Sequence, residues 1–153
     1  MGRCTRPSHS PNRIHRLKPG AAALDLWVPA DPRLAGVDGI AMLADGAVYV
    51  NTFFAGDIFR ISVNADGSAG DMVKIETSML LSRPDGLRTV GPKTLIQAEG
   101  QGRVTELTVD GNRAEVRVVK DGLSGATGVT LVGETALVLV ERAKAVVVPY
   151  RRP

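Results

Sequence analysis

The 153-residue sequence contains one cysteine, few aromatic residues and no long apolar run. Because Cys4 has no second cysteine to pair with, an intramolecular disulfide and a cysteine-based metal site are both excluded. No stretch reaches the ~18 apolar residues that a membrane-spanning helix needs. The basic first 20 residues lack the apolar segment of a secretory signal. We therefore expect a cytoplasmic protein with no membrane partner. A periplasmic or secreted location is the alternative if the natural N-terminus lies further upstream.

The charge and the apolar residues are distributed in ways that limit the function classes. Aromatic residues make up only 4% of the chain, so a core must be built from aliphatic side chains. The net charge is +3, but the basic residues gather at the two ends, whereas residues 25–141 hold all 16 acidic residues. Because no basic stripe interleaved with aromatic residues occurs, we expect no nucleic-acid partner.

A short phrase returns three times along the chain, at intervals of about 47 and 42 residues. Its copies are Asp38-Gly39-Ile40, Asp85-Gly86-Leu87 and Thr127-Gly128-Val129. Each copy opens an apolar strand, a tight turn and a second apolar strand, and the turns carry Asp-Gly or other glycine pairs typical of hairpins. A period of about 40–50 residues built only from strands is typical of the blades of a β-propeller.

The repeat predicts an all-β fold that forms part of a propeller ring. We expect an irregular or disordered extension over residues 1–12 and the two outer strands of one blade over 13–36. Complete four-stranded blades are expected over 37–82 and 83–125, and an incomplete last blade over 126–153. Because a propeller closes with four to eight blades, these residues account for about half of a ring.

The repeat also places oxygen-bearing side chains at one mouth of the central channel. In a blade, the start of the first strand and the end of the second lie on the same face. Asp38, Asp85 and Thr127 therefore lie close to Thr52, Glu99 and Glu141. Converging carboxylates suit a hard divalent cation such as Ca²⁺. The candidate ligands are Asp38 and Asp85, with Glu99 and Glu141 as weaker candidates. The alternative is that both aspartates are turn formers, because Asp before Gly is common in turns.

Three stretches resemble the SMP-30/gluconolactonase family. Arg83-Pro84-Asp85-Gly86-Leu87, followed by Gly102-Arg103-Val104, is similar to the penultimate blade of that family. Val37-Asp38-Gly39-Ile40 resembles the preceding blade, where the family typically has Asn-Gly. Ala126-Thr127-Gly128-Val129 resembles the last blade. The resemblance covers roughly residues 13–151, as the C-terminal half of a family member.

This resemblance implies a six-bladed propeller with one divalent cation in its channel, Ca²⁺ first and Zn²⁺ or Mg²⁺ as alternatives. It implies that Asp38 and Asp85 are metal ligands, with Asp38 in place of an asparagine, and that Asp85 is also the catalytic base. The substrates it implies are small lactones or esters. The family's further ligands come from blades that nothing in this chain matches.

Two hypotheses about function follow. The first is a hydrolase of lactones or esters that depends on a divalent cation, carried by a truncated family member. A homodimer would complete its ring. The second is a propeller fragment without catalytic activity, or a binding scaffold. The sequence therefore does not decide whether this chain is an enzyme.

Overall fold

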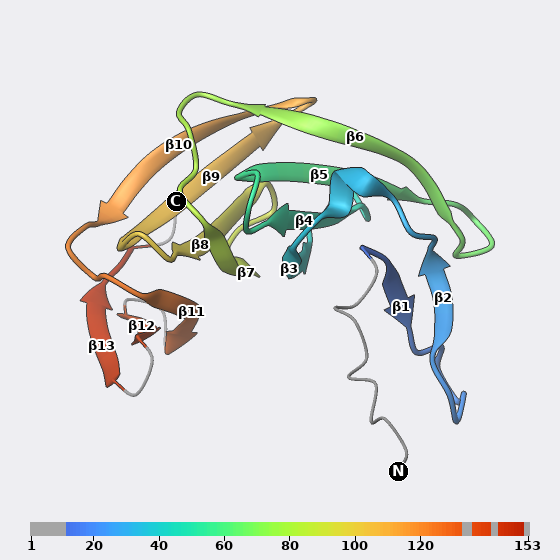
Figure 1. The fold of residues 1–153 in the computed structure, drawn as a ribbon, viewed down its shortest axis with the longest axis horizontal. Helices are drawn as coiled ribbons and strands as arrows, with labels where there is room; N and C mark the ends of the chain where they lie inside the picture. The colour runs from blue at the N-terminus through green and yellow to red at the C-terminus, as the bar shows by residue number, and fades with distance from the viewer. Residues whose placement is uncertain (1–11, 133–135, 142–143, 152–153) are drawn as a thin grey trace, which may run out of the picture.

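The structure, a computed structural model, describes residues 12–132, the backbone of 136–141, and residues 144–151. These residues form thirteen β-strands and one turn of 3₁₀ helix, arranged as an arc with a concave inner edge (Figure 1). The all-β, partial-propeller fold expected from the repeat is thereby confirmed. The described part of the chain contains no helix long and apolar enough to cross a membrane.

The first complete blade is an antiparallel meander of four strands. It consists of β3 (Val37–Met42), β4 (Val48–Thr52), β5 (Asp57–Val63) and β6 (Ala69–Thr77). Its tight turns follow from Asp-Gly pairs: Gly46 and Gly67 both adopt a positive φ, a conformation that residues with a Cβ rarely take. The position of β3 on the inner edge brings the first copy of the phrase to the channel.

The second complete blade repeats this plan and touches the first at its outer edge. It consists of β7 (Pro84–Thr89), β8 (Thr94–Glu99), β9 (Arg103–Asp110) and β10 (Arg113–Lys120). The outer strands β6 and β10 pair in parallel through Arg113 opposite Glu76 and Ala114 opposite Thr77. This short ladder joins the two blades into one eight-stranded sheet.

Smaller sheets flank the two blades. On the N-terminal side, β1 (Ile14–Arg16) and β2 (Asp25–Val28) form a hairpin, followed by the 3₁₀ turn η1 (Pro32–Leu34). On the C-terminal side, β11 (Ala126–Val132), β12 (Ala136–Glu141) and β13 (Lys144–Pro149) form a three-stranded sheet. Residues 1–11 lie outside the described part, so the irregular extension stays a prediction.

The hydrophobic core is divided among the interfaces between neighbouring blades. The central cluster joins the two complete blades through Tyr49, Ile58, Leu87 and Leu107, among others, and all four are almost completely buried. A second cluster packs the β1–β2 hairpin against the first blade, and a third packs β11 and β13 against the second blade. Successive side chains of a strand point to opposite faces of its sheet, so the strands of one blade contribute to the packing on both of its faces.

The glycines of the repeated phrase lie where inner strands of adjacent blades approach each other. A Cβ added at Gly39 would lie 2.6 Å from the Leu87 Cβ on β7. One added at Gly86 would lie 3.0 Å from the Cα of Gly128 on β11. The phrase therefore needs glycine for blade-to-blade packing, in addition to any role at the channel.

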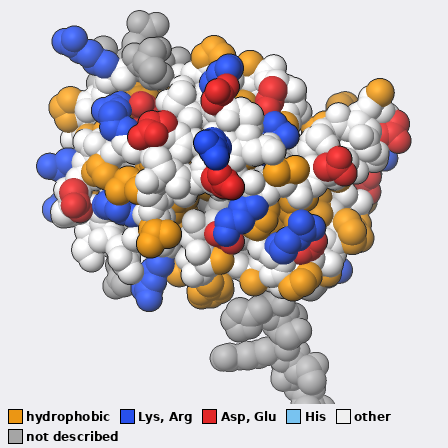
Figure 2. Space-filling model, turned by 90° about the horizontal axis from the view of Figure 1, so that it is seen from above, with side chains coloured by type: hydrophobic (Ala, Val, Ile, Leu, Met, Phe, Trp, Pro, Cys, Tyr) orange, Lys and Arg blue, Asp and Glu red, His pale blue; other side chains and the backbone are white. Residues whose placement is uncertain are grey.

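The outer rim carries charges of both signs. Figure 2 views the molecule from above Figure 1, and acidic and basic side chains are interspersed on this face with isolated apolar ones. Exposed ion pairs such as Arg113–Glu76 and Lys93–Asp110 contribute to this pattern. A mixed surface of this kind is typical of a solvated face.

Candidate functional site

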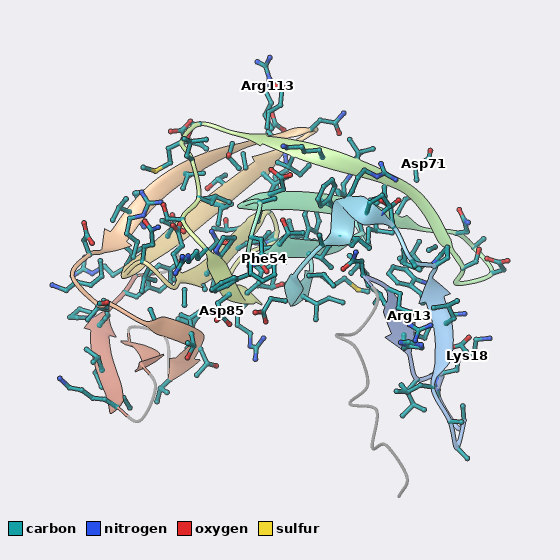
Figure 3. The ribbon with its side chains drawn as sticks, viewed as in Figure 1. Arg13, Lys18, Phe54, Asp71, Asp85 and Arg113 are labelled. Atoms are coloured by element: carbon teal, nitrogen blue, oxygen red, sulfur yellow. The ribbon has the colours of Figure 1, made fainter. Side chains whose placement is uncertain are left out.

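The candidate site is built from two carboxylates on neighbouring inner strands. Asp38 is the second residue of β3 and is exposed, and Asp85 is the second residue of β7 and is half-buried. In both strands the pairing register shifts at this point, between Val37 and Ile40 and between Pro84 and Leu87. Such a bulge redirects a side chain out of the regular alternation. Figure 3 shows Asp85 at the concave inner edge of the arc.

Both carboxylates have raised pKa values, and at Asp85 the charge of Asp38 contributes. Burial raises the pKa of Asp85 to about 6, and the nearby charge of Asp38 adds to the increase, whereas a hydrogen bond from the Gly86 backbone N–H opposes it. Partial desolvation of its carboxyl group also raises the pKa of Asp38, although the residue as a whole is exposed. Neither carboxylate has a Lys, Arg or His within ion-pair distance among the described residues. A cation at this place would relieve the unfavourable charge.

Asn51, a completely buried residue of β4, fixes the backbones of both phrases. Its Oδ1 accepts a 2.7 Å hydrogen bond from the Gly39 N–H, and its Nδ2 donates a 2.7 Å bond to the Asp85 carbonyl oxygen. One side chain thus holds the residue after Asp38 and the backbone of Asp85 in place. The sequence carried a signal for Asn51, namely a carboxamide inside an otherwise apolar buried strand, but no role was predicted for it.

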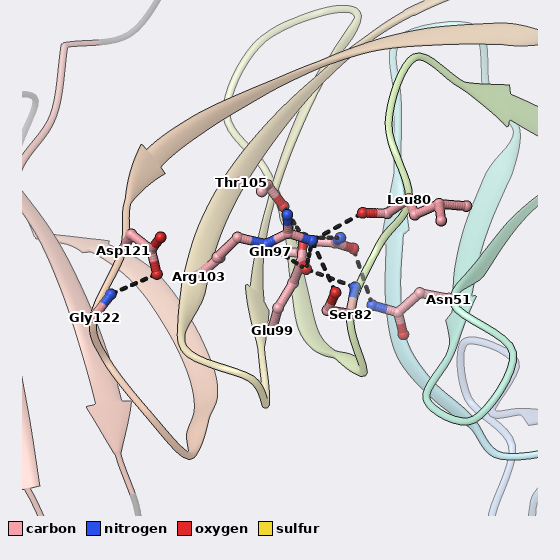
Figure 4. Close-up of polar contacts among 9 residues, drawn as sticks. All are labelled: Asn51, Leu80, Ser82, Gln97, Glu99, Arg103, Thr105, Asp121 and Gly122. Atoms are coloured by element: carbon pink, nitrogen blue, oxygen red, sulfur yellow. Dashed lines mark hydrogen bonds and ion pairs between the residues drawn. The ribbon is translucent and has the colours of Figure 1, made fainter.

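A buried polar network continues from Asn51 into the second blade (Figure 4). Asn51 Nδ2 also lies 3.3 Å from Gln97 Oε1, and Gln97 Nε2 lies 3.4 Å from Glu99 Oε1. Thr105 donates a 2.7 Å hydrogen bond to the same Glu99 oxygen. This network links the site to the interior of β8 and β9.

Glu99 is the centre of that network, and both of its oxygens have donors. Its side chain is 0% exposed and forms a 2.6 Å ion pair with Arg103 Nη2, while the Ser82 backbone N–H donates a 2.7 Å bond to Oε2. Arg103 in turn donates to the Leu80 carbonyl oxygen. A buried carboxylate with this complete set of donors holds the loop before β7 in place, a role that competes with metal binding.

The remaining predicted positions divide as follows. Thr52 is buried, and its Oγ1 accepts a hydrogen bond from the Asp57 N–H at the β4–β5 turn, which is a structural role. The backbone of Glu141 pairs with Ala126 at the end of β12, the expected place, but its side chain lies outside the described residues. Its role as a weaker ligand candidate therefore stays a prediction.

The oxygen atoms available at this site are of the types that bind a hard cation. Carboxylate and carbonyl oxygens are the ligands that Ca²⁺ and Mg²⁺ prefer. Within the described part of the chain, however, no three His, Cys, Asp or Glu residues converge closely enough to hold a metal ion by themselves. Asp38 and Asp85 would supply two ligands, and the others would come from elsewhere in a closed ring.

Comparison with known proteins identifies the fold. No family model and no curated protein sequence matches this chain. Among solved structures, a gluconolactonase from Xanthomonas campestris is 21% identical, with a TM-score of 0.71 over 95% of this chain and 46% of the other. Virginiamycin B lyase from Staphylococcus aureus is 17% identical, with a TM-score of 0.64 over 90% and 44%. A luciferin-regenerating enzyme is 16% identical, with a TM-score of 0.61 over 78% and 40%.

These likenesses establish the propeller architecture. The chain spans less than half of the length of each of these three structures. Two of the three are a gluconolactonase and a lyase, so the same blade arrangement supports more than one reaction. The chemistry of this chain must therefore be argued from its own residues.

Proposed function

We propose that this chain forms half of a six-bladed propeller of the SMP-30/gluconolactonase type, which hydrolyses small lactones or esters with the help of a divalent cation. The observation that carries the proposal is the pair formed by Asp38 and Asp85. These carboxylates come from neighbouring blades, have no cationic partner in the described part of the chain, and lie close enough for one to raise the pKa of the other. A bound divalent cation, Ca²⁺ first, best accounts for such a pair.

The roles of the residues follow from this arrangement. Asp38 and Asp85 would hold the cation, which would supply Lewis-acid polarisation of the lactone or ester carbonyl. Asn51 ties together the backbone segments that carry the two carboxylates. The carboxylate of Asp85 would also accept the proton of the attacking water. The water oxygen bonds to the carbonyl carbon, the ester C–O bond breaks and the leaving oxygen takes a proton, which gives a hydroxy acid.

The ring is completed, in this proposal, by a second copy of the chain. The face of β3 that points away from the second blade exposes Ile40 and Met42, at 48% and 55%. With Trp27 and Val63 they line an apolar hollow of about 300 Å³ beside the β1–β2 hairpin. The inner strands of another blade would cover this hollow, and the chain spans 40–46% of the three structures compared above. Two copies together supply nearly one ring.

The metal site is tested by calorimetric titration of the folded chain with CaCl₂. We expect the Asp85→Asn and Asp38→Asn variants each to lose at least tenfold in affinity, because each removes a charged ligand. The matched control is Asp110→Asn, since the side chain of Asp110 is 91% exposed at the end of β9 in the second blade. Equal Ca²⁺ affinity in the wild type and both site variants would contradict the proposed centre.

Ring closure and activity are tested together. Light scattering should give twice the 16.2 kDa of one chain, and the Ca²⁺-loaded dimer should hydrolyse glucono-1,5-lactone. Ile40→Asp should dissociate the dimer and abolish hydrolysis. A folded, Ca²⁺-loaded dimer without hydrolytic activity towards lactones or simple esters would overturn the catalytic proposal.

The second candidate function is a binding scaffold without catalysis. It is favoured by the absence of a three-ligand carboxylate or histidine cluster among the described residues. In that case the chain would remain monomeric and would bind Ca²⁺ weakly or not at all. The titration and the light-scattering measurement thus separate the two candidates.

A further inference from the structure

A second group of side chains lies on the same face of the arc as the two carboxylates. Phe53 and Phe54 follow the end of β4, and the Phe53 N–H donates a 2.8 Å hydrogen bond to the carbonyl of Gly36, two residues before Asp38. Arg83 lies two residues before Asp85, and its carbonyl accepts a 2.8 Å bond from the Gly100 N–H. The loops that carry these side chains are therefore tied to the segments that lead into the site.

Arg83 has a backbone conformation that is unusual for its residue type. Its φ is +56°, the only positive value at a non-glycine residue in the described part of the chain, and it precedes a proline, which further disfavours helical conformations. A glycine would take this conformation more readily. Residues held in such conformations gather at ligand sites, because the surrounding structure must fix them there.

The guanidinium of Arg83 lies over the Phe53 ring. Its Cζ lies 5.9 Å from the centre of the Phe53 ring. Stacking on an aromatic ring uses the face of the guanidinium, while the five N–H donors lie in its plane. No carboxylate in the described part of the chain lies within ion-pair distance of it. Arg83 is thus a cation beside an aromatic ring, with no anionic partner among the residues that the structure describes.

Phe54 adds an exposed aromatic surface beside Phe53, the ring over which Arg83 lies. Its side chain is 81% exposed, yet its ring meets that of Phe53 edge to face, with centroids 5.5 Å apart. Gly36 leaves room for it, because a Cβ there would lie 2.9 Å from the Phe54 Cε2. Figure 3 shows Phe54 and Asp85 both near the inner edge of the arc.

We propose that Arg83 and Phe54 form a recognition subsite of this channel mouth for an organic carboxylate that carries a ring. Arg83 pairs with the carboxylate through two parallel N–H···O bonds, and Phe54 packs against the ring. This inference rests on the proposed function, because it names the class of substrate or product that the proposed site selects. Hydrolysis of an ester of a ring-bearing acid yields such a carboxylate and an alcohol, so the subsite also fits the acid product of that reaction.

The subsite is tested with benzoate as the probe, titrated by calorimetry into the full chain in EDTA. Because EDTA removes divalent cations, no metal ion can hold the benzoate carboxylate in place of Arg83. We expect benzoate to bind at least tenfold more tightly than neutral benzamide, and binding to weaken as salt rises. Acetate, which lacks a ring, should bind severalfold more weakly than benzoate, and Phe54→Ala should abolish that difference.

Variants of Arg83 decide the assignment. Arg83→Gln should weaken benzoate binding at least tenfold, and Arg83→Lys should fall between, because lysine keeps the charge but not the planar fork. Arg83→Gly removes the side chain while accommodating the positive φ, so it remains informative if the glutamine variant folds poorly. The matched control is Arg113→Gln, on the outer rim far from Asp85 (Figure 3).

The outcomes separate this inference from the proposed function. Benzoate that does not bind, or binds equally to the wild type and to Arg83→Gly, overturns the subsite whatever the Ca²⁺ titration gives. Arginine-dependent binding of benzoate together with failed Ca²⁺ binding supports the subsite and overturns the metal-dependent hydrolase.

Discussion

Asp85 and Glu99 lie at the same end of the antiparallel strands β7 and β8, where Pro84 pairs with Glu99, yet their surroundings give them different roles. Glu99 is fully buried and receives hydrogen bonds from Ser82, Arg103 and Thr105. Asp85 is half-buried, faces the carboxylate of Asp38 and has a raised pKa. The first carboxylate is stabilised by the protein and the second is destabilised by it. A carboxylate that the fold leaves uncompensated is the better candidate for binding a ligand.

The largest expected effect comes from breaking the Glu99–Arg103 pair. Arg103→Met keeps the apolar stem but leaves a buried carboxylate without its cation, which should lower the free energy of unfolding by about 3–5 kcal/mol. Urea denaturation measures this loss. The control is Lys93→Met, which breaks the exposed Lys93–Asp110 pair and should change stability by less than about 0.5 kcal/mol. Similar losses in both variants would mean that burial of the pair is energetically unimportant.

The next effect comes from the contact between the two inner strands. Gly39→Ala forces a Cβ against Leu87 on β7 and should cost about 3 kcal/mol, the upper end for overpacking. Gly46→Ala, in a turn with no atom within 4 Å, should cost only about 1 kcal/mol for its positive φ. Thermal unfolding compares the two. If the turn variant is the less stable one, the role assigned to the glycine of the phrase is wrong.

The sharpest comparison makes the same chemical change at both carboxylates. Glu99→Gln places an amide N–H₂ among donors and should cost about 1–3 kcal/mol. Asp85→Asn removes an unfavourable charge and should raise stability at pH 7 in EDTA, by about 1 kcal/mol or less because water screens a half-exposed group. Urea denaturation in EDTA gives both values. Changes of the same sign would remove the distinction between the two sites.

The smallest effect is the pH dependence that Asp85 produces. Its pKa is about 6 in the folded chain against 3.8 for a model aspartate, so the folded state keeps a proton that the unfolded state releases. The free energy of unfolding should therefore fall as pH rises from about 4 to 6 and then level off. Subtracting the curve of Asp85→Asn from that of the wild type isolates this contribution. A difference curve that rises over this window would contradict the raised pKa.

The architecture was largely predictable because it depends on local patterns that repeat. Alternating apolar strands and Asp-Gly turns at a steady period identify blades, and the observed β3–β6 and β7–β10 lie within residues 37–82 and 83–125. The parallel contact between β6 and β10 was not predictable, since it joins residues about 40 positions apart with no sequence signature. The register shifts at Asp38 and Asp85 were not predicted from the sequence either.

The site was predictable only in part. The repeat selected Asp38 and Asp85 as equivalent positions and placed Glu99 at the same channel mouth, but it could not distinguish a carboxylate facing Arg103 from one facing another carboxylate. Arg103 lies four residues after Glu99 across a β-turn, so their pairing depends on how β8 and β9 align. Asn51 had no predicted role, because its partners Gly39 and Asp85 belong to two different blades.

The sequence by itself determined that this chain forms strands, turns and blades, because hydrophobic alternation and glycine conformations act over a few residues. It also selected Asp38, Asp85 and Glu99 as candidate ligands. Only the tertiary structure decided what each carboxylate meets: the charge of Asp38 for Asp85, and Arg103 for Glu99. It alone also brought the Phe53 ring to Arg83. The physical reason is that electrostatic and desolvation energies depend on distances between blades, and those distances are set by packing across their interfaces.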